Sequence, residues 1–357
     1  MFSIETFNLI SQQLNIYIGI ILFIFGILGN LMNIVIFQHR SLRSNSSCIY
    51  MFTSSLASIV QICFGLIPRI VTEGFYYDWT LINMVWCKIR NYVTSCASLT
   101  ALTCFIWLSI DRFCSTCRQL KWRYLNSAFL AKQICILTLI SWMIVNFPIL
   151  IYVQLDYTLH SCRATSIIWS KISVYFISLF CYGIFPWFFM SLFGLLTLKN
   201  LRRRINPLSR IVVTRITRLN TQLTSMLFLQ ILLAVLSSIP YCVQSIYNNL
   251  TQSIEKTPLR QAQEKLFLEI VRLAFYLNYA GTFYVNYLSS KIFRHLTKLI
   301  LIHLCTNKRD ASGEITIINH HYSRSRRRRN GTTVISTPII WLLLSFFFSF
   351  WINEFQI

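Results

Sequence analysis

The segment 87–117 carries residues that could do chemistry at each of its ends. Cys87 opens it, and the charged pair within Asp111–Phe113 closes its apolar run. An acid beside a base at the edge of a membrane span is costly to hold there, so this pair marks a candidate functional site. The next cysteine that could lie on the same side of the membrane as Cys87 is Cys162. We therefore predict a disulfide between Cys87 and Cys162, which the secretory pathway permits.

Other classes of chemistry have no matching residues. The histidines fall mostly in loops and in the tail, and the cysteines lack the spacing of a metal site. A transporter or channel would need ionisable residues deep in the membrane, and the apolar runs offer almost none. We expect no enzymatic activity, no cofactor and no metal ion.

The elements that position these residues are predicted to be membrane helices. Hydrophobic residues make up 55% of the 357 residues and charged residues 12%, which is too apolar for a soluble globular protein. A helix needs about 20 residues to cross the hydrocarbon core. Apolar runs long enough for this lie at 14–38, 47–70, 84–110, 131–154, 166–198, 222–247 and 266–289. The predicted fold is an all-α bundle of seven transmembrane helices.

Lysine and arginine predict the orientation of this bundle. The chain has a net charge of +22, and most of its basic residues fall in the tail and in alternate connections. The amino-terminal segment contains Glu5 but no lysine or arginine. Because basic connections stay in the cytosol, we expect a multi-pass plasma-membrane protein with its amino terminus outside. This one-sided placement accounts for the positive charge without nucleic-acid binding.

The sequence divides into five parts on this interpretation. Residues 1–13 form an extracellular amino terminus, 14–289 the helix bundle, and 290–305 an amphipathic helix on the inner membrane surface. A basic cytoplasmic tail, 306–334, and an apolar segment, 335–357, follow. That last segment is either an eighth span or an error in the gene model. Cys305 is either an acylation site or an idle thiol.

Several residues within the spans are expected to have structural roles. A polar side chain in mid-span must find its hydrogen-bond partner inside the bundle, and a proline provides a place where the helix can bend. We expect Asn30 and Ser58 to join Asn278 in a neutral hydrogen-bonded cluster. The other structural candidates are Trp142, Pro186 and Pro240.

Together these features resemble the rhodopsin-like (class A) G-protein-coupled receptors. The resemblance covers about residues 14–305. Within that family the chain is most similar to invertebrate peptide receptors of the FMRFamide type. The residues that carry the family resemblance are Gly29–Asn30, Cys87, Asp111–Phe113, Trp142, Pro186, Pro240 and the segment Ser289–Arg294 that follows the seventh span.

The resemblance implies a receptor that binds an extracellular ligand and activates a heterotrimeric G protein. Arg112 would meet the G protein, and Asp111 would restrain it at rest. Phe113 belongs to the same motif. Asn286 is a candidate to support Arg112, because the tyrosine that the family places in the fifth span is Gly194 here.

Departures from the family pattern leave a second interpretation open. Ser58 stands where the family usually has an acid in the second span. Without this carboxylate we expect ligand affinity not to depend on sodium. The segment Thr282–Asn286 replaces the Asn-Pro-x-x-Tyr motif, and Ser237–Pro240 lacks the usual tryptophan. A non-signalling decoy or a chemosensory receptor of the same fold therefore remains an alternative.

Residues in the outer half of the predicted helix bundle argue against two classes of ligand. Thr94 stands where amine receptors carry an aspartate, and Tyr276 where an opsin needs a lysine. A neuropeptide fits the mixture of polar and aromatic side chains better, although a small molecule also stays open. Glu269 either pairs with a ligand cation or with Arg272. The pocket candidates are Thr94, Ser98, Tyr182, Tyr241, Ser245, Glu269, Arg272 and Tyr276.

Overall fold

The structure, a computed structural model, describes residues 4–39, 42–77, 83–117, 122, 126–156, 161–204, 215–251 and 254–306. The apolar segment 335–357 and the basic tail, apart from its first residue, lie outside these ranges. The side chain of Cys305 also lies outside the described part. The eighth span and the acylation site therefore stay predictions.

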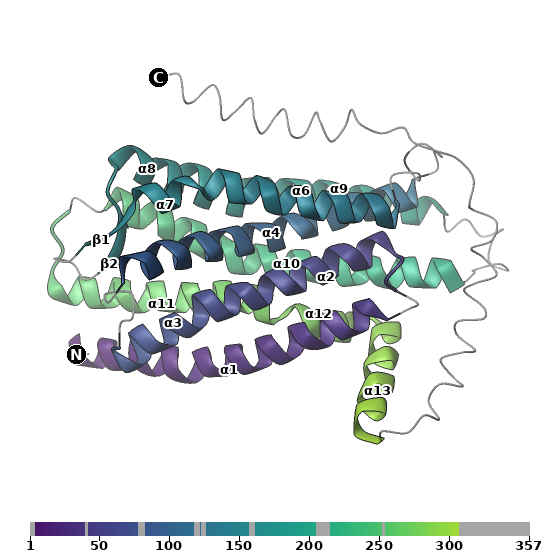
Figure 1. The fold of residues 1–357 in the computed structure, drawn as a ribbon, viewed down its shortest axis with the longest axis horizontal. Helices are drawn as coiled ribbons and strands as arrows, with labels where there is room; N and C mark the ends of the chain where they lie inside the picture. The colour runs from purple at the N-terminus through teal and green to yellow at the C-terminus, as the bar shows by residue number, and fades with distance from the viewer. Residues whose placement is uncertain are drawn as a thin grey trace. The chain divides into compact units, whose positions relative to one another are not determined.

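Long helices that lie side by side make up the described part of the chain (Figure 1). They are α1 (Ile4–Gln38), α2 (Ser46–Gln61), α4 (Met84–Thr116), α6 (Ala128–Asn146), α9 (Phe185–Arg204), α10 (Arg215–Leu250) and α11 (Pro258–Ala280). Shorter segments extend or connect them, and those labelled η are π-helical. These are η1 (Ile62–Leu66), α3 (Ile67–Arg69), η2 (Ile70–Gly74), α7 (Pro148–Tyr152), α8 (Ile167–Ile172), η4 (Ser173–Ile184), α12 (Thr282–Ser289) and α13 (Lys291–Thr306).

Six of the helical segments described are long and apolar enough to cross a membrane. The seventh bundle helix, α11, is not among them, because Arg260, Glu264, Lys265, Glu269 and Arg272 interrupt its apolar character. It nevertheless packs between α1 and α10. The predicted seven-helix bundle is confirmed, and in α11 the charged residues are spread along the helix instead of lying near its ends.

The helix α4 packs against α2, α6, α9 and α10. Most of its stretch 96–109 is buried. Trp142 of α6 donates a hydrogen bond from Nε1 to Thr103 Oγ1 at 2.9 Å, and Ser95 Oγ donates to Asn146 Oδ1 at 2.6 Å. These bonds satisfy polar groups inside the bundle and fix α6 against α4.

Prolines coincide with irregular helical turns. Pro68 lies between the π-helical segments η1 and η2, and η4 ends two residues before Pro186. A proline removes one backbone donor, and wider π turns accommodate the change. Pro240 lies inside α10. Near it, Trp187 Nε1 donates to Ser238 Oγ at 2.8 Å and joins α9 to α10.

The run 266–289, predicted as one helix, is divided at Gly281. Its first part belongs to α11 and its second part is α12. A side chain at Gly281 would place a Cβ 2.9 Å from the Leu277 carbonyl oxygen and 3.0 Å from Leu233. Glycine fits this close approach, and α11 ends here without the proline that the family motif would supply.

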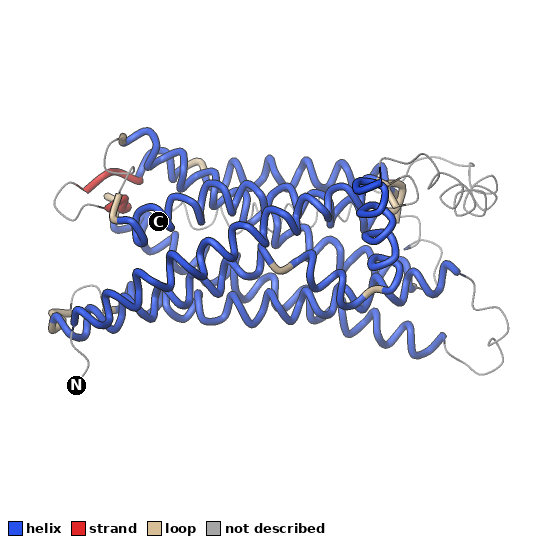
Figure 2. Tube along the Cα trace, turned by 90° about the horizontal axis from the view of Figure 1, so that it is seen from below, coloured by secondary structure: helices blue, strands red, loops and turns tan. Residues whose placement is uncertain are grey.

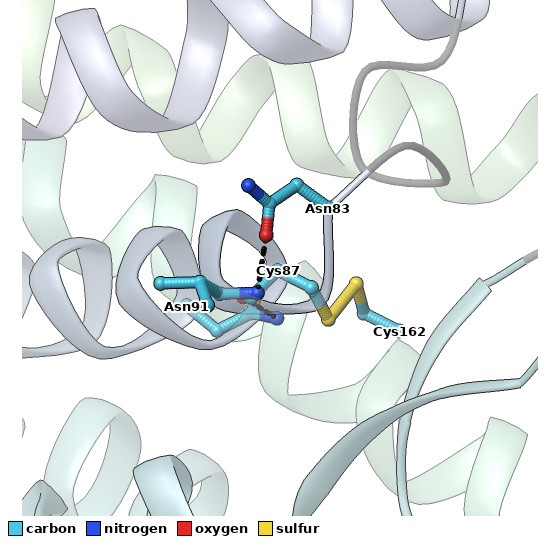
Figure 3. Close-up of a disulfide and its surroundings, with 5 residues drawn as sticks. Asn83, Cys87, Asn91 and Cys162 are labelled. Carbon is cyan, nitrogen blue, oxygen red and sulfur yellow. Dashed lines mark hydrogen bonds between the residues drawn. A yellow bond between two sulfur atoms is a disulfide. The ribbon is translucent and has the colours of Figure 1, made fainter.

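A two-stranded hairpin lies at one end of the bundle, and the rest of the described chain is almost entirely helical (Figure 2). Strand β1 (Val153–Asp156) pairs antiparallel with β2 (Ser161–Ala164), with Leu155 opposite Cys162. Cys162 is bonded to Cys87, and their Cα atoms are 6.1 Å apart (Figure 3). The predicted disulfide is confirmed.

The first turns of α4 are fixed beside this disulfide. Asn83 caps the helix, because its Oδ1 accepts a hydrogen bond from the Val85 amide at 2.8 Å. Asn91 Nδ2 donates to the Cys87 carbonyl oxygen at 3.0 Å (Figure 3). The hairpin is thereby attached to a well-ordered helix start.

We predict that Cys87→Ser lowers the thermal unfolding midpoint and reduces delivery to the cell surface. Losing a disulfide that closes a long loop typically costs about 2–4 kcal/mol. Cys63→Ser is the matched control, because Cys63 is a free thiol. Thermal unfolding of the purified proteins measures the difference. Equal midpoints for both variants would contradict the prediction.

Candidate functional site

Two buried ion pairs lie near opposite ends of the bundle. We call the end that holds the disulfide the Cys87 end and the other the Arg112 end. Both ends are visible in Figure 1, with the hairpin β1–β2 at the first and α13 beside the second.

At the Arg112 end, Arg112 Nη2 donates to Asp111 Oδ2 at 2.9 Å. Asp111 also accepts hydrogen bonds from Ser46 Oγ, at 2.6 Å, and from Ser47 Oγ, both in the first turn of α2. Asn45, which caps α2, lies 3.4 Å from Arg112 Nη2 through its Oδ1. Both carboxylate oxygens are therefore occupied.

Arg112 is only 1% exposed and Asp111 is 6% exposed. The pair lies near the end of α4, where the sequence placed it, but the expected contact with water is wrong. The start of α2 covers the pair, and its two serines replace water as hydrogen-bond donors to the carboxylate. The adjacent residues Asn45, Ser46 and Ser47 were the available sequence signal, because such residues favour helix starts.

Phe113 lies beside this pair and packs between aromatic rings. Its ring centroid is 5.6 Å from that of Phe193 in α9 and 6.2 Å from that of Trp122. These contacts hold the end of α4 against α9.

Between the two ends, five polar side chains form a continuous hydrogen-bonded series that we call the amide chain. Gln230 of α10 donates to Asn286 Oδ1 at 2.6 Å, and Asn286 Nδ2 donates to Asn33 Oδ1 at 3.4 Å. Asn33 donates to Thr282 Oγ1 at 3.2 Å, and that hydroxyl donates to Asn30 Oδ1 at 3.3 Å. The amide chain joins α10, α12 and α1 without any charged group.

The expected cluster of Asn30, Ser58 and Asn278 is not the one that forms. The buried Ser58 hydroxyl has no partner among the described residues. Sequence reasoning identified Asn30 and Asn286 but missed Gln230 and Asn33. An amide in an apolar run was the available signal, since such a group needs a partner inside the bundle.

At the Cys87 end, Glu269 of α11 is held by Arg69 of α3. Arg69 Nη2 lies 2.5 Å from Glu269 Oε1 and 2.6 Å from Oε2, and Arg69 Nε lies 3.1 Å from Oε2. Asn15 of α1 donates to the same Oε2 at 3.0 Å. Four contacts therefore converge on a carboxylate that is only 1% exposed.

Glu269 was expected to pair either with a ligand cation or with Arg272, and this geometry corrects both expectations. A guanidinium that approaches from another helix can contact both carboxylate oxygens, which makes it the stronger partner. Arg69 is the last residue of α3. Its side chain is 12% exposed and directed at Glu269.

Aromatic pocket candidates gather beside this pair. Tyr182 and Ser98 share a hydrogen bond between their hydroxyl groups. The Tyr182 and Tyr241 ring centroids are 6.1 Å apart, and Tyr241 stacks on Phe275 at 4.4 Å. Phe275, which sequence reasoning missed, completes the cluster.

The remaining pocket candidates are less closely joined. Thr94 Oγ1 donates to the Arg90 carbonyl oxygen of its own helix at 2.8 Å. Ser245 is half-buried in α10. Tyr276 reaches η1, where a side chain at Gly65 would place a Cβ 2.7 Å from the tyrosine hydroxyl. The glycine therefore leaves room for Tyr276.

Other carboxylates near this end already have partners. Glu264, outside the run 266–289, accepts from Lys256 at 2.5 Å, from Tyr247 at 2.7 Å and from Arg260 at 2.9 Å. Burial raises the pKa of Glu264, but these hydrogen bonds outweigh it and bring the pKa to about 2. The group is charged at neutral pH.

We predict that Glu269→Gln markedly lowers the thermal unfolding midpoint. Removing one partner of a buried pair typically costs about 3–5 kcal/mol, because the other charge stays buried. Glu73→Gln is the matched control, because the Glu73–Lys265 pair is 3.1 Å long and more exposed. That pair should contribute about 0–1 kcal/mol. Equal losses in the two variants would contradict a dominant role for Glu269.

Comparison with known proteins agrees with this architecture. Residues 29–280 match the model of the family described as 7 transmembrane receptor (rhodopsin family). G-protein coupled receptor 183 of Rattus norvegicus and that of Homo sapiens are each 28% identical over 134 residues, covering 37% of this chain and 36% of the relative. The Bos taurus protein is 29% identical over 137 residues, with the same coverage.

The matched region spans only about a third of the length of these curated relatives. They give no support to the narrower resemblance to FMRFamide-type receptors. The family match, in contrast, covers more than half of the chain and coincides with most of the helix bundle. The chain is therefore a membrane receptor rather than an enzyme, and it belongs to the rhodopsin family of seven-transmembrane receptors.

Proposed function

We propose that this receptor lies in the plasma membrane with its amino terminus outside, binds an extracellular ligand at the Cys87 end, and activates a heterotrimeric G protein at the Arg112 end. The distribution of lysine and arginine supports this orientation. A disulfide at the Cys87 end is also compatible with an extracellular position.

The buried Arg112–Asp111 pair is the observation that carries the signalling proposal. A guanidinium with 1% exposure cannot contact a cytosolic partner. The described conformation therefore corresponds to a resting state, in which Asp111 and the start of α2 hold Arg112 inside the bundle. Activation requires a second conformation that releases Arg112, and a ligand acts by shifting the population toward it.

The amide chain holds α10 in the described position. Gln230 is the member of this chain that α10 contributes, and its bond to Asn286 ties α10 to α12. Outward movement of α10 would break this bond. Gln230 and Asn286 thus stand in for the motif residues that the chain lacks in α12.

For the ligand we propose a peptide of the neuropeptide class. Ser98, Tyr182, Tyr241 and Tyr276 offer hydroxyl groups and aromatic surfaces that suit a peptide's amides and aromatic side chains. A small molecule could use the same surfaces. Calcium and cAMP responses of receptor-expressing cells to a neuropeptide panel test this class of ligand.

A non-signalling decoy or a chemosensory receptor is the second candidate function. The altered segments Thr282–Asn286 and Ser237–Pro240 favour a decoy, because a decoy needs no switch. The intact pairing of Asp111 with Arg112 favours signalling.

We predict that Arg112→Ala abolishes G-protein activation by an active panel member while leaving its binding affinity unchanged. Arg112 lies at the end of the bundle opposite the proposed ligand site. Lys132→Ala is the control, because Lys132 is an exposed cation at the start of α6. Guanine-nucleotide exchange and ligand binding are measured at matched surface expression. Unchanged exchange in the Arg112 variant would favour a decoy or another coupling surface.

Gln230→Leu should raise signalling in the absence of ligand. Loss of one hydrogen bond costs the resting state about 1 kcal/mol, which multiplies a small active fraction about fivefold. Gln244→Leu is the matched control on the same helix, because Gln244 bonds Asn248 within α10. Basal nucleotide exchange distinguishes the two. A basal rate in the Gln230 variant no higher than in the Gln244 variant would exclude this bond as a restraint.

A further inference from the structure

Arg272 differs from the other buried charges of the bundle. It lies on α11 one turn after Glu269 and about one turn before Tyr276, and its side chain is half-buried. In the part of the chain that the structure describes, its guanidinium makes no hydrogen bond or ion pair. A cation held away from water without a partner is unfavourable, so a residue of this kind marks a candidate binding site.

Neighbouring charges do not neutralise Arg272. The groups that act on it electrostatically are Arg69, Glu269, Tyr241 and Tyr276. Glu269 is the carboxylate in this set, and Arg69 and Asn15 already occupy both of its oxygens. Arg69 adds a second positive charge rather than removing one.

Further charged groups described at the Cys87 end, those of Arg90, Glu264 and Glu73, are either basic or already paired. The charge of Arg90 in α4 acts on Tyr276, as the charges of Arg69 and Arg272 do. Glu264 is bonded to Lys256 and Arg260, and Glu73 is paired with Lys265. Among the described groups around Tyr276, Arg272 is thus left without a carboxylate of its own, because Glu269 is fully engaged by Arg69 and Asn15.

Aromatic rings adjoin this positive region. Tyr241 stacks on Phe275 with ring centroids 4.4 Å apart, and Phe275 also meets Tyr276 at 6.3 Å. A ligand that approaches Arg272 would therefore contact aromatic surface next to the charge. Such a surface favours an apolar or aromatic body directly attached to the charged group.

We propose that the ligand of this receptor carries an acidic group on an apolar body, and that Arg272 binds this group as its missing counter-ion. The inference rests on the proposed function, because it concerns the ligand site at the Cys87 end. It assigns the recognised chemistry to an anion rather than to a cation paired with Glu269. A peptide with a free carboxyl terminus and a fatty-acid-like ligand share this chemistry, whereas a peptide with an amidated terminus lacks it.

The test uses the purified full-length receptor in a neutral detergent and measures thermal unfolding with two acid–amide pairs at matched ionic strength. The first pair is 3-(4-hydroxyphenyl)propionate and its amide, which imitate the end of a peptide. The second is octanoate and octanamide, which imitate a fatty acid. A compound that binds the folded receptor raises the unfolding midpoint in proportion to its affinity, whether or not a G protein responds.

We expect at least one acid to raise the midpoint and its amide to have little effect. Arg272→Gln should weaken the apparent affinity for that acid about tenfold or more, because a charge-assisted hydrogen bond is lost. Arg272→Lys keeps the positive charge and should keep the preference for the acid, which separates recognition from a folding defect. Whichever acid binds more tightly indicates whether the natural source resembles a peptide end or a fatty acid.

Arg260→Gln is the matched control, since Arg260 lies on the same helix but is exposed and paired with Glu264. It should leave acid binding unchanged. Equal midpoints with acid and amide for both pairs, or full acid binding in Arg272→Gln, would overturn the proposal. A receptor that binds the acid but never activates a G protein would contradict the proposed signalling function and leave this inference standing.

Discussion

A charged or amide side chain in a membrane span is stabilised by a partner inside the protein, and this constraint joins most of the helices of the bundle. Asp111 meets it with Arg112 and the two serines at the start of α2. Glu269 meets it with Arg69 and Asn15. Between these pairs the amide chain supplies neutral partners. Because Asp111, Glu269 and the amide chain each have partners on other helices, these bonds hold those helices together at rest.

The parts predicted correctly from the sequence depend on local patterns. Long apolar runs predict the helices because the bilayer sets their length, and the position of Cys162 between two spans predicts its partner Cys87. The helix break at Gly281 was missed, because the proline of the family motif is absent there, and the close approach of Leu233 from another helix exists only in the folded bundle. The partner of Glu269 was also missed, since Arg69 lies two hundred residues away in the sequence and reaches it only in the folded bundle.

Where the sequence departs from the family motifs, other residues make contacts that support the helices. Ser58 replaces an acid and has no hydrogen-bond partner among the described residues, while Asn30 is bonded within the neutral amide chain. The segment Thr282–Asn286 lacks proline and tyrosine, yet Gly281 provides a break and Asn286 a link to α10. We infer that the chain retains the two elements a switch requires, a restrained arginine and a movable helix, with different residues in the supporting roles.

We propose that the bonds of Asp111 hold the described bundle in a resting state. The most direct measurement is the rate of guanine-nucleotide exchange that the purified receptor catalyses on a G protein without ligand, compared between wild type and Asp111→Asn. Asparagine keeps the size of the side chain but removes the charge that holds Arg112. We expect a clearly faster exchange for the variant, because Arg112 is no longer held by a charge. An unchanged or slower rate, with the variant folded and in equal amount, would contradict it.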